Sequence, residues 1–219
     1  MGKKIQKSYK ITKNNSLEVL KGIDLKIKFG EIAAITGKSG AGKSTLLHIL
    51  GTLDSPDSGN LFFDSQKVFS YSQQHLADFR NQKIGFIFQF HHLLPEFTVL
   101  ENVLIPSMIS GKRNTEKARE LLSEVDMLPR ADHKPSEISG GEAQRAAIAR
   151  ALINSPEIIF ADEPTGNLDS ENANAVIELI FNLRKKYNQT FVIVTHNEEF
   201  ANNCDRIIKM NDGIISEII

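Results

Sequence analysis

The chain has very little cysteine: Cys204 is the single one among 219 residues. One cysteine cannot form a disulfide within the chain, and such scarcity is typical of proteins that fold in a reducing compartment. We interpret Cys204 as a small space-filling side chain near a helix end rather than as a reactive thiol. A disulfide-stapled secreted domain is therefore excluded, and we expect a cytoplasmic protein.

An excess of charge of either sign is also missing. The 26 Lys and Arg residues nearly balance the 27 Asp and Glu residues. Proteins that attract nucleic acid or anionic lipid over long range do so with a basic field, which this composition does not supply. We therefore expect no nucleic acid among the partners.

Long apolar runs are the third absence. Stretches such as EIIFA and FVIVT hold four apolar residues each, whereas a helix needs roughly 20 to cross a bilayer. The start, MGKKIQ, has no apolar signal region. We expect no direct membrane insertion, so any role at a membrane has to come through a partner protein.

What is present is a chain of alternating strands and helices. The run at 32–36, IAAIT, opens with four consecutive apolar residues, which is typical of a strand buried on both faces. It leads into a glycine-rich loop and the helix STLLHIL. Ahead of it, apolar and charged residues alternate over 23–28, which predicts an antiparallel strand that Gly30 turns into the next.

The second half begins with an inserted helical stretch. Thr98 and Asn114 are predicted helix N-caps, and no strand-like run occurs before residue 158. The strand EIIFAD, a helix over roughly 170–186, the strand TFVIVTH and a hairpin turned by NDG follow. This order predicts an α/β fold with a mostly parallel sheet, an antiparallel β subdomain and an inserted helical subdomain. Because the loop GKSGAGKST between the strand at 32–36 and its helix has the P-loop pattern, the expected fold is that of a P-loop NTPase.

The glycine-rich loop GKSGAGKST satisfies the pattern G-x-x-x-x-G-K-[ST] between a predicted strand and a helix. The alternative is an ordinary glycine-rich turn that matches the pattern by chance. The position between a strand and a helix disfavours it. Backbone N–H groups of such a loop point at phosphates, Lys43 reaches the β/γ oxygens, and Ser44 ligates Mg²⁺. The candidate phosphate-binding residues are Gly37, Lys38, Ser39, Gly40, Ala41, Gly42, Lys43, Ser44 and Thr45.

Two carboxylates follow the buried strand at 158–161. Asp162 is placed to hold the Mg²⁺ shell, and Glu163 is the candidate for polarising an attacking water. Gln89 ends the strand IGFIF and His196 follows FVIVT, so both are expected at the same sheet edge. Adjacent acids are often only solvated and a lone Gln or His is often a satisfied polar group, but the shared edge favours a site.

A second candidate phosphate cradle lies about a hundred residues downstream of the first. In SGGEAQRAAIARAL, Ser139 and Glu142 form a capping box with Gly140 and Gly141 between them. A helix N-terminus with glycines leaves its backbone N–H groups accessible, and such a terminus can bind a phosphate group. Tyr9 precedes the predicted antiparallel strand. Its ring can stack on adenine, or it can be an ordinary surface tyrosine, and the residues alone leave both interpretations open.

Taken together, GKSGAGKST, Gln89, SGGEAQ, IIFADE, NLD at 167–169 and His196 resemble the ATP-binding subunit of an ABC transporter, in that family's order over nearly the whole chain. In this family two subunits bind head to tail, and the signature of one touches the γ-phosphate in the P-loop of the other. The resemblance therefore implies an ATPase that binds ATP and Mg²⁺, forms a homodimer in ATP, and uses its second cradle for the partner's nucleotide.

The same resemblance implies roles for single residues. Asp169 lies in the loop that crosses between sites, His196 holds the γ-phosphate, and Tyr9 stacks on adenine. Gln89 ligates Mg²⁺ with Ser44 and Asp162 and couples the nucleotide to the membrane subunit. A single ATPase domain over residues 1–219 is implied, with a core at 1–90 and 138–219 and a helical subdomain at about 91–137.

Three residues depart from the family's usual pattern. Ile138 stands where Leu is favoured, Ala143 where Lys, Arg or Gln is usual, and Asn197 where Asp commonly follows the histidine. None of the three removes a group with a named catalytic role. We therefore expect an active ATPase whose rate is altered at most.

Within the family, the stretches 80–102 and 133–141 resemble the branch that drives lipoprotein release from the inner membrane, and less closely the macrolide-exporter and cell-division ATPases. This implies peripheral attachment to the cytoplasmic face of the inner membrane through permease subunits. His91 and His92, just after Gln89, are either ordinary loop residues or part of a permease-docking surface.

Two alternatives come from other classes of protein. A soluble ABC ATPase for DNA repair or iron–sulfur assembly is one, but the DNA-repair members interrupt their motifs with a coiled coil or zinc module, and here the gap from Gln89 to Ser139 is a helical insertion without cysteine. A non-catalytic nucleotide sensor is the other. It would lack Glu163 or His196, and both are present.

Overall fold

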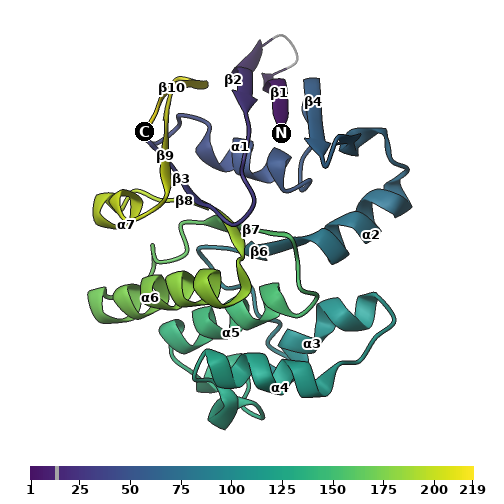
Figure 1. Cartoon of the computed structure of the whole chain (residues 1–219), viewed down its shortest axis with the longest axis vertical. Helices are drawn as coiled ribbons and strands as arrows, with labels where there is room; N and C mark the ends of the chain where they lie inside the picture. The colour runs from purple at the N-terminus through teal and green to yellow at the C-terminus, as the bar shows by residue number, and fades with distance from the viewer. Residues whose placement is uncertain (13–14) are drawn as a thin grey trace. The chain divides into compact units, whose positions relative to one another are not determined.

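The computed structural model describes residues 1–12 and 15–219. They divide into two compact units (Figure 1): the first is Met1–Ala77 with Phe191–Ile219, and the second is Asp78–Thr190. The helical subdomain expected at about 91–137 lies within the second unit.

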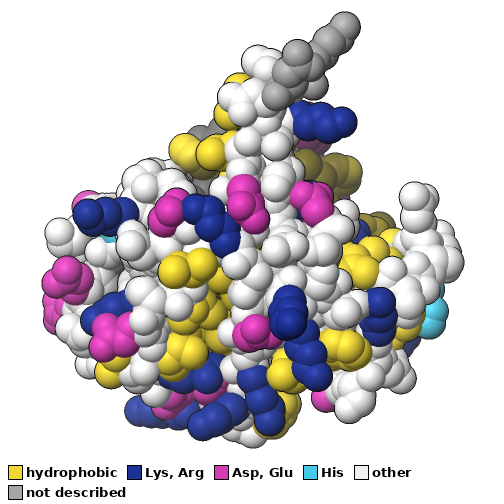
Figure 2. All heavy atoms as spheres, turned by 90° about the horizontal axis from the view of Figure 1, so that it is seen from above, with side chains coloured by type: hydrophobic (Ala, Val, Ile, Leu, Met, Phe, Trp, Pro, Cys, Tyr) yellow, Lys and Arg dark blue, Asp and Glu magenta, His cyan; other side chains and the backbone are white. Residues whose placement is uncertain are grey.

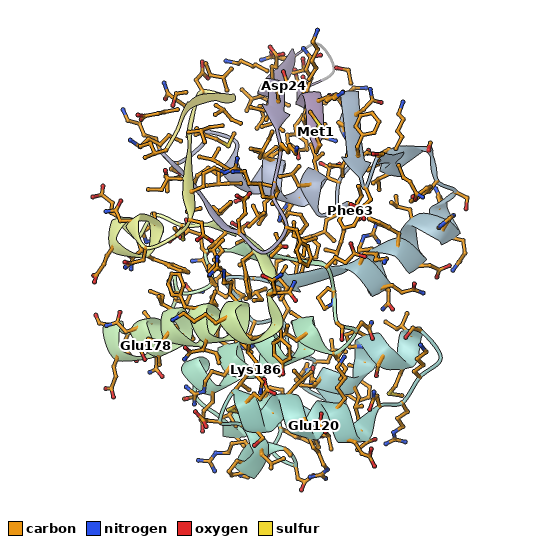
Figure 3. All side chains as sticks on the ribbon, in the orientation of Figure 1. Met1, Asp24, Phe63, Glu120, Glu178 and Lys186 are labelled. Carbon is orange, nitrogen blue, oxygen red and sulfur yellow. The ribbon has the colours of Figure 1, made fainter. Side chains whose placement is uncertain are left out.

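An antiparallel sheet opens the first unit, with strand order β2-β1-β4-β5. Its strands are β1 (Gly2–Thr12), β2 (Asn15–Leu25), β4 (Ser58–Phe63) and β5 (Gln66–Lys67). β1 pairs with both β2 and β4, and Figure 3 labels Met1 at the start of β1 and Phe63 at the end of β4.

The strand predicted at 23–28 ends earlier than the alternation suggested. Ile23 and Leu25 are buried and Asp24 is exposed, as expected, but β2 stops at Leu25. Leu25 pairs with Gly2, the first residue of β1, so the partner strand runs out at this point. The turn at Gly30 (φ 74°) then leads into the next strand.

The parallel strands of the first unit carry its core. β3 (Ile32–Gly37) lies between β8 (Thr190–Val194) and β9 (Arg206–Asn211), parallel to both. A strand flanked on both sides is buried along its length, which accounts for the apolar run of β3. β10 (Ile214–Ile218) returns antiparallel to β9 and confirms the predicted NDG hairpin.

Three short helices complete the first unit. They are α1 (Lys43–Leu50), η1 (Val68–Ser70) and α7 (Glu198–Asn202). α1 buries four aliphatic side chains, Leu46, Leu47, Ile49 and Leu50. Near the end of α7 the Cys204 Sγ donates to the carbonyl oxygen of Phe200 at 3.3 Å, and burial raises the pKa of this thiol to about 12.

The second unit pairs two parallel strands with most of the helices. β6 (Ile84–Ile87) runs parallel to β7 (Ile158–Asp162). The helices are α2 (Gln73–Lys83), which begins in the first unit, α3 (Val99–Ile109), α4 (Thr115–Glu124), η2 (Leu128–Arg130), η3 (Pro135–Glu137), α5 (Gly140–Leu152) and α6 (Ser170–Tyr187).

Helix starts in this unit follow the sequence signals. Thr98 and Ser139 form capping boxes with Glu101 and Glu142, and Asn114 caps α4. α5 is the central helix and contacts α3, α4, α6 and β6. Figure 3 labels Glu120 on α4, and Glu178 and Lys186 on α6.

The surface agrees with the balanced composition. In Figure 2, Lys and Arg side chains are interspersed with Asp and Glu side chains over the face shown. Across residues 1–12 and 15–219, no helix combines the length and the apolar character that crossing a membrane requires.

Candidate functional site

The glycine-rich loop follows β3 and leads into α1, both labelled in Figure 1. Gly37 has φ 143°, and a Cβ at this position would lie 2.1 Å from the carbonyl oxygen of Met210. Only glycine allows this close approach of the loop to β9. At the other end of the loop, Gly42 is the N-cap of α1 and has no side chain to cover the helix start.

Lys43 lies over this loop. Its Nζ donates to the carbonyl oxygens of Gly37 and Lys38 at 2.9 and 3.0 Å. Ala41 is buried, and its carbonyl oxygen accepts from the N–H of Gly213 at 3.2 Å. The hydrogen bond from Gly213 therefore helps to hold the loop in place. The ammonium of Lys43 lies over the loop, where it can reach a bound phosphate group.

His196 and the loop follow neighbouring parallel strands. Ile35 of β3 pairs with Val194 of β8, and the N–H of Thr195 donates to the carbonyl oxygen of Ile35 at 3.2 Å. His196 comes next and is exposed. The carboxyl ends of β3 and β8 thus bring a histidine and a phosphate cradle to one edge, the usual place of ligands in α/β folds.

Tyr9 is placed beside the start of α1. Its hydroxyl donates to Asp54 Oδ2 at 2.8 Å and makes a second hydrogen bond with the side chain of Thr45. The tyrosine remains 41% exposed. Adenine stacking by Tyr9 stays a prediction, and this position near the P-loop helix is compatible with it and with an ordinary surface tyrosine.

In the second unit, Gln89 and the two carboxylates lie at or just after the carboxyl ends of two paired parallel strands, β6 and β7. Ile87 pairs with Ala161, and Gln89 lies two residues beyond the end of β6 rather than at its last position. Gln89 Nε2 donates to Asn167 Oδ1 at 3.1 Å, and Asn167 Nδ2 donates back to the carbonyl oxygen of Gln89 at 3.3 Å. This reciprocal pair ties the segment after β6 to the loop after β7.

Glu163 has an unusual backbone. Its φ of 48° lies in the left-handed region, which costs a non-glycine residue roughly 1–3 kcal/mol and is often found at active sites. The carbonyl oxygen of Glu163 accepts from the N–H of Gly166 at 3.0 Å. The turn after β7 therefore fixes the direction in which Glu163 leaves the strand next to Asp162.

The second cradle is a helix start braced by side chains. Ser139 Oγ accepts from the N–H of Glu142 at 3.3 Å, and Glu142 Oε2 accepts from the N–H of Ser139 at 2.8 Å. Arg130 Nε donates to Glu142 Oε1 at 3.0 Å. The backbone hydrogen bond from Ser139, followed by that of Arg130, lowers the pKa of Glu142 to about 2.

Asp169 is the N-cap of α6, and Asn172 in the first turn of α6 lies against this cradle. Asp169 Oδ1 accepts from the N–H of Asn172 and Asp169 Oδ2 from Asn172 Nδ2, at 2.9 and 2.8 Å. A Cβ on Gly141 would lie 2.2 Å from Asn172 Oδ1, so only glycine permits this contact. These hydrogen bonds from Asn172 also lower the pKa of Asp169.

Several residues of this region were not predicted. Gln144 Nε2 donates to the carbonyl oxygen of Phe88 at 3.1 Å, and Arg150 donates to those of His91 and His92 at 2.6 and 2.7 Å. α5 therefore holds the segment that follows β6. Asn167 lies within the quoted NLD and could have been suspected, but the pairing of Arg150 leaves no local signal because its partners are 58 and 59 residues away.

The expected metal ligands are oxygen donors of the kind that Mg²⁺ prefers. Ser44 offers a hydroxyl, Asp162 a carboxylate and Gln89 an amide oxygen. Mg²⁺ is commonly held by one or two carboxylates together with substrate phosphates and water. Because Gln89 uses its Nε2 to bond Asn167, the carbonyl oxygen of that amide is the atom that can turn to a cation. The donor set fits.

Comparison with known proteins finds similar sequences along almost the whole chain. Residues 20–166 match the family model described as "ABC transporter". The chain is 56% identical over 209 residues to "Lipoprotein-releasing system ATP-binding protein LolD" of Bacteroides fragilis, covering 94% of this chain and 97% of that protein. It is 55% identical over 204 residues to the LolD protein of Cytophaga hutchinsonii, covering 91% and 93%.

Two solved structures resemble the fold over the full chain. A dimeric structure of the ATP-binding cassette MJ0796 in a post-hydrolysis state, bound to ADP and Pi, superposes with a TM-score of 0.90 at 39% identity. A second dimeric structure of MJ0796, a bacterial ABC transporter cassette, gives a TM-score of 0.90 at 40% identity. Each covers 100% of this chain and 97% of the MJ0796 chain. The fold predicted from the sequence is confirmed.

Proposed function

This chain belongs to the ABC transporter family, and from that premise we propose that it is the ATPase subunit that powers lipoprotein release from the inner membrane through a paired permease. It is an ATP-binding ABC ATPase. The observation that carries the finer proposal is the 54–56% identity to LolD proteins along 91–94% of the chain. The chain also contains all the motifs that hydrolysis requires in this family.

The first unit supplies the main contacts to ATP. Backbone N–H groups of residues 37–42 and the bare start of α1 surround the phosphates. Lys43 Nζ lies 2.9 Å from the carbonyl oxygen of Gly37, and it can turn from there to the β/γ oxygens. Tyr9 stacks on the adenine, and His196 holds the γ-phosphate.

The second unit supplies the metal ligands and the base. Asp162 and Gln89 are the proposed Mg²⁺ ligands of this unit, and Ser44 is the proposed ligand from the P-loop; the ion would supply positive charge to phosphate oxygens. Glu163 orients and polarises the attacking water. The left-handed backbone of Glu163 supports this role, because a strained conformation is retained where the direction of a side chain matters.

The signature acts on the nucleotide of a second copy of the chain. Ser139 Oγ accepts the N–H of Glu142, which leaves the hydroxyl proton free to be donated to a phosphate oxygen. The N–H groups of Gly140 and Gly141 belong to the first helical turn, which has no intrahelical acceptor. Asp169 lies at the crossing between the two sites. The dimeric assembly of the similar MJ0796 cassette supports a homodimer in ATP.

The permease docks beside Gln89. Phe90 is 65% exposed, and Leu94 and Phe97 nearby are exposed as well. Arg150 fixes the backbone of His91 and His92 that presents this apolar segment. Through this partner the protein is attached peripherally to the cytoplasmic face of the inner membrane.

The proposal is tested in cells in which synthesis of the chain can be switched off. Outer-membrane lipoproteins should then accumulate in the inner membrane, and wild-type protein but not Lys43→Ala should restore their distribution. Pull-down from detergent-solubilised membranes should recover an integral membrane permease. Normal lipoprotein distribution after depletion would contradict the proposal. Loss of drug export or of cell division instead would favour the related branches.

A further inference from the structure

Tyr9 belongs to a group of three side chains in the first unit. Lys7 and Tyr9 are two residues apart on β1 and therefore on the same face of the strand. Lys7 Nζ donates to Asp54 Oδ1 at 2.8 Å, and the Tyr9 hydroxyl donates to Asp54 Oδ2 at 2.8 Å. One carboxylate thus takes a hydrogen bond from each side chain, one on each oxygen.

The ammonium of Lys7 also lies over the Tyr9 ring, 5.2 Å from its centroid. A cation at this distance is attracted by the π face. Lys7 is only 9% exposed, and its Nζ has a further acceptor in the carbonyl oxygen of Ser55 at 2.7 Å. A buried ammonium held by three groups has little freedom, so it stays fixed over one face of the ring.

Asp54 is anchored to the helix that follows the phosphate loop. The N–H groups of Leu53 and Asp54 donate to the carbonyl oxygen of His48, in the last turn of α1, at 2.8 and 3.3 Å. The Tyr9 ring is consequently tied to the same element that begins with Lys43. The distance between ring and phosphate cradle is fixed by these contacts before any nucleotide binds.

We propose that Asp54 and Lys7 are positioning residues that hold the Tyr9 ring in the orientation in which it stacks on the adenine of ATP. The proposal rests on the adenine role of Tyr9 given under Proposed function. Asp54 bonds the Tyr9 hydroxyl and Lys7 lies over the Tyr9 ring, so the role proposed for them concerns the ring and not the phosphates. They act by preorganisation: a tyrosine on an exposed strand loses rotational freedom when a base stacks on it, and a ring that is already fixed loses less.

The ionisation states support a fixed clamp. Burial alone would lower the pKa of Lys7, but the hydrogen bond and charge of Asp54 outweigh it and leave that pKa raised. Burial acts in the opposite sense on Asp54, whose pKa is nevertheless lowered by the hydrogen bonds from Lys7 and Tyr9. The pair is therefore charged, and the phenol of Tyr9 keeps its proton, since burial and Asp54 raise its pKa.

A nearby carboxylate provides a matched control. Asp57 Oδ2 accepts from the N–H of Ser8 at 2.7 Å, and Asp57 Oδ1 lies 3.9 Å from Lys7 Nζ. Asp57 lies in the same loop as Asp54 and is also a carboxylate. Its side chain accepts a hydrogen bond from the β1 backbone and forms an ion pair with Lys7, whereas the hydroxyl of Tyr9 donates to Asp54. Asp57→Asn therefore perturbs the same junction while it keeps the Tyr9 hydrogen bond intact.

The experiment compares two ligands that share the phosphates and differ in the base. Binding of a non-hydrolysable ATP analogue and of inorganic tripolyphosphate, both with Mg²⁺, is measured by calorimetry. Tyr9→Phe and Asp54→Ala should each weaken the analogue about three- to tenfold, the scale of one aromatic contact, with tripolyphosphate unchanged. The double mutant should be clearly less weakened than the sum of the two single effects, because both changes remove the same hydrogen bond to Asp54 and Tyr9→Phe removes only the bond to Thr45 in addition. Asp57→Asn should bind both ligands as the wild type does.

Each other outcome counts against a defined claim. Equal weakening of both ligands in Asp54→Ala would make the carboxylate merely structural and overturn the proposal. If Asp54→Ala fails to fold, Tyr9→Phe decides, since it leaves the Lys7–Asp54 pair in place. Wild-type affinity of Tyr9→Phe, beside a weakened Tyr9→Ala, would overturn the clamp and keep the adenine role. Wild-type affinity of Tyr9→Ala would remove the adenine role itself.

Discussion

The two candidate phosphate cradles are both helix starts, yet they are built by different means. The first relies on backbone: Gly42 is a bare N-cap, and Lys43 is the charged side chain that lies over the loop. The second relies on side chains, since Ser139 and Glu142 cap each other and Arg130 holds Glu142. A bare cradle can surround phosphate from all sides, whereas a capped one presents a few groups in a fixed direction.

This difference suggests a division of labour. A cradle that binds ATP in its own subunit has to supply most of the affinity, and backbone N–H groups together with one lysine do so. A cradle that meets the nucleotide of another subunit has to arrive in a fixed geometry, which side-chain bracing provides. If this is correct, damage to the first cradle removes binding, and damage to the second removes turnover while binding remains.

The largest effect is expected for Glu163→Gln, which should separate binding from hydrolysis in the second unit. Glutamine keeps the shape and loses the negative charge, so hydrolysis should fall on the order of 10²–10⁴-fold. ATP should still bind through Lys43 and Ser44, and it should hold two subunits together. Sizing chromatography in ATP and in ADP, beside a phosphate-release assay, measures both. A variant that stays monomeric in saturating ATP would contradict the role of Glu163.

Lys43→Ala should show the opposite pattern in the first unit. It removes a charge-assisted contact to the phosphates, worth about 10- to 100-fold in affinity. Titration with a fluorescent ATP analogue measures the loss, and the exposed Lys10→Ala on β1 is the control, expected to bind as the wild type does. Near wild-type affinity of Lys43→Ala would mean that the backbone alone carries binding.

A mixture of two inactive variants tests whether the cradles meet across subunits. Ser139→Arg and Lys43→Ala should each inactivate a homodimer. Random pairing at equal amounts gives half heterodimers, each with one intact composite site, so about a quarter of the wild-type ATPase activity should return. Mixtures that stay inactive although heterodimers form would contradict independent shared sites.

Local motifs made the candidate site predictable, and long-range pairs did not. The P-loop, the capping boxes at Thr98 and Ser139, and the carboxylates after β7 are all contained in short stretches of sequence. The bonds of Asp54 to Lys7 join residues 47 positions apart, and no local pattern encodes them. Such pairs form only after the strands have found their partners.

The fold was also predictable where a local pattern encodes it. The prediction failed where pairing between distant segments decides the structure. Apolar runs identified β3 and β8 because both are buried. No strand was predicted over Gly2–Thr12, where β1 lies; its buried residues include Lys7, which a hydrophobic pattern would assign to the surface. The end of β2 at Leu25 also escaped prediction, because it is set by where β1 begins.

The smallest effect concerns the bracing of the second cradle. Glu142→Gln keeps a hydrogen-bond acceptor for the N–H of Ser139 but loses the charge attraction to Arg130, so the free energy of unfolding at pH 7 should fall by about 1 kcal/mol. The pKa of Glu142, about 2 in the folded protein, lies below the value of about 4.3 for an unfolded chain. Stabilisation by the ionised group is therefore present above pH about 4.3 and is lost as the pH falls toward 2.

The wild type and Glu142→Gln should consequently differ in urea unfolding at pH 7 and converge as the pH is lowered through that window. Glu120→Gln on α4 is a suitable control, because Glu120 is exposed. Nucleotide affinity should stay unchanged in Glu142→Gln, since this cradle does not hold the ATP of its own subunit. A difference in stability that persists at pH 2, or weakened ATP binding by the monomer, would show that Glu142 acts otherwise than by bracing the helix start.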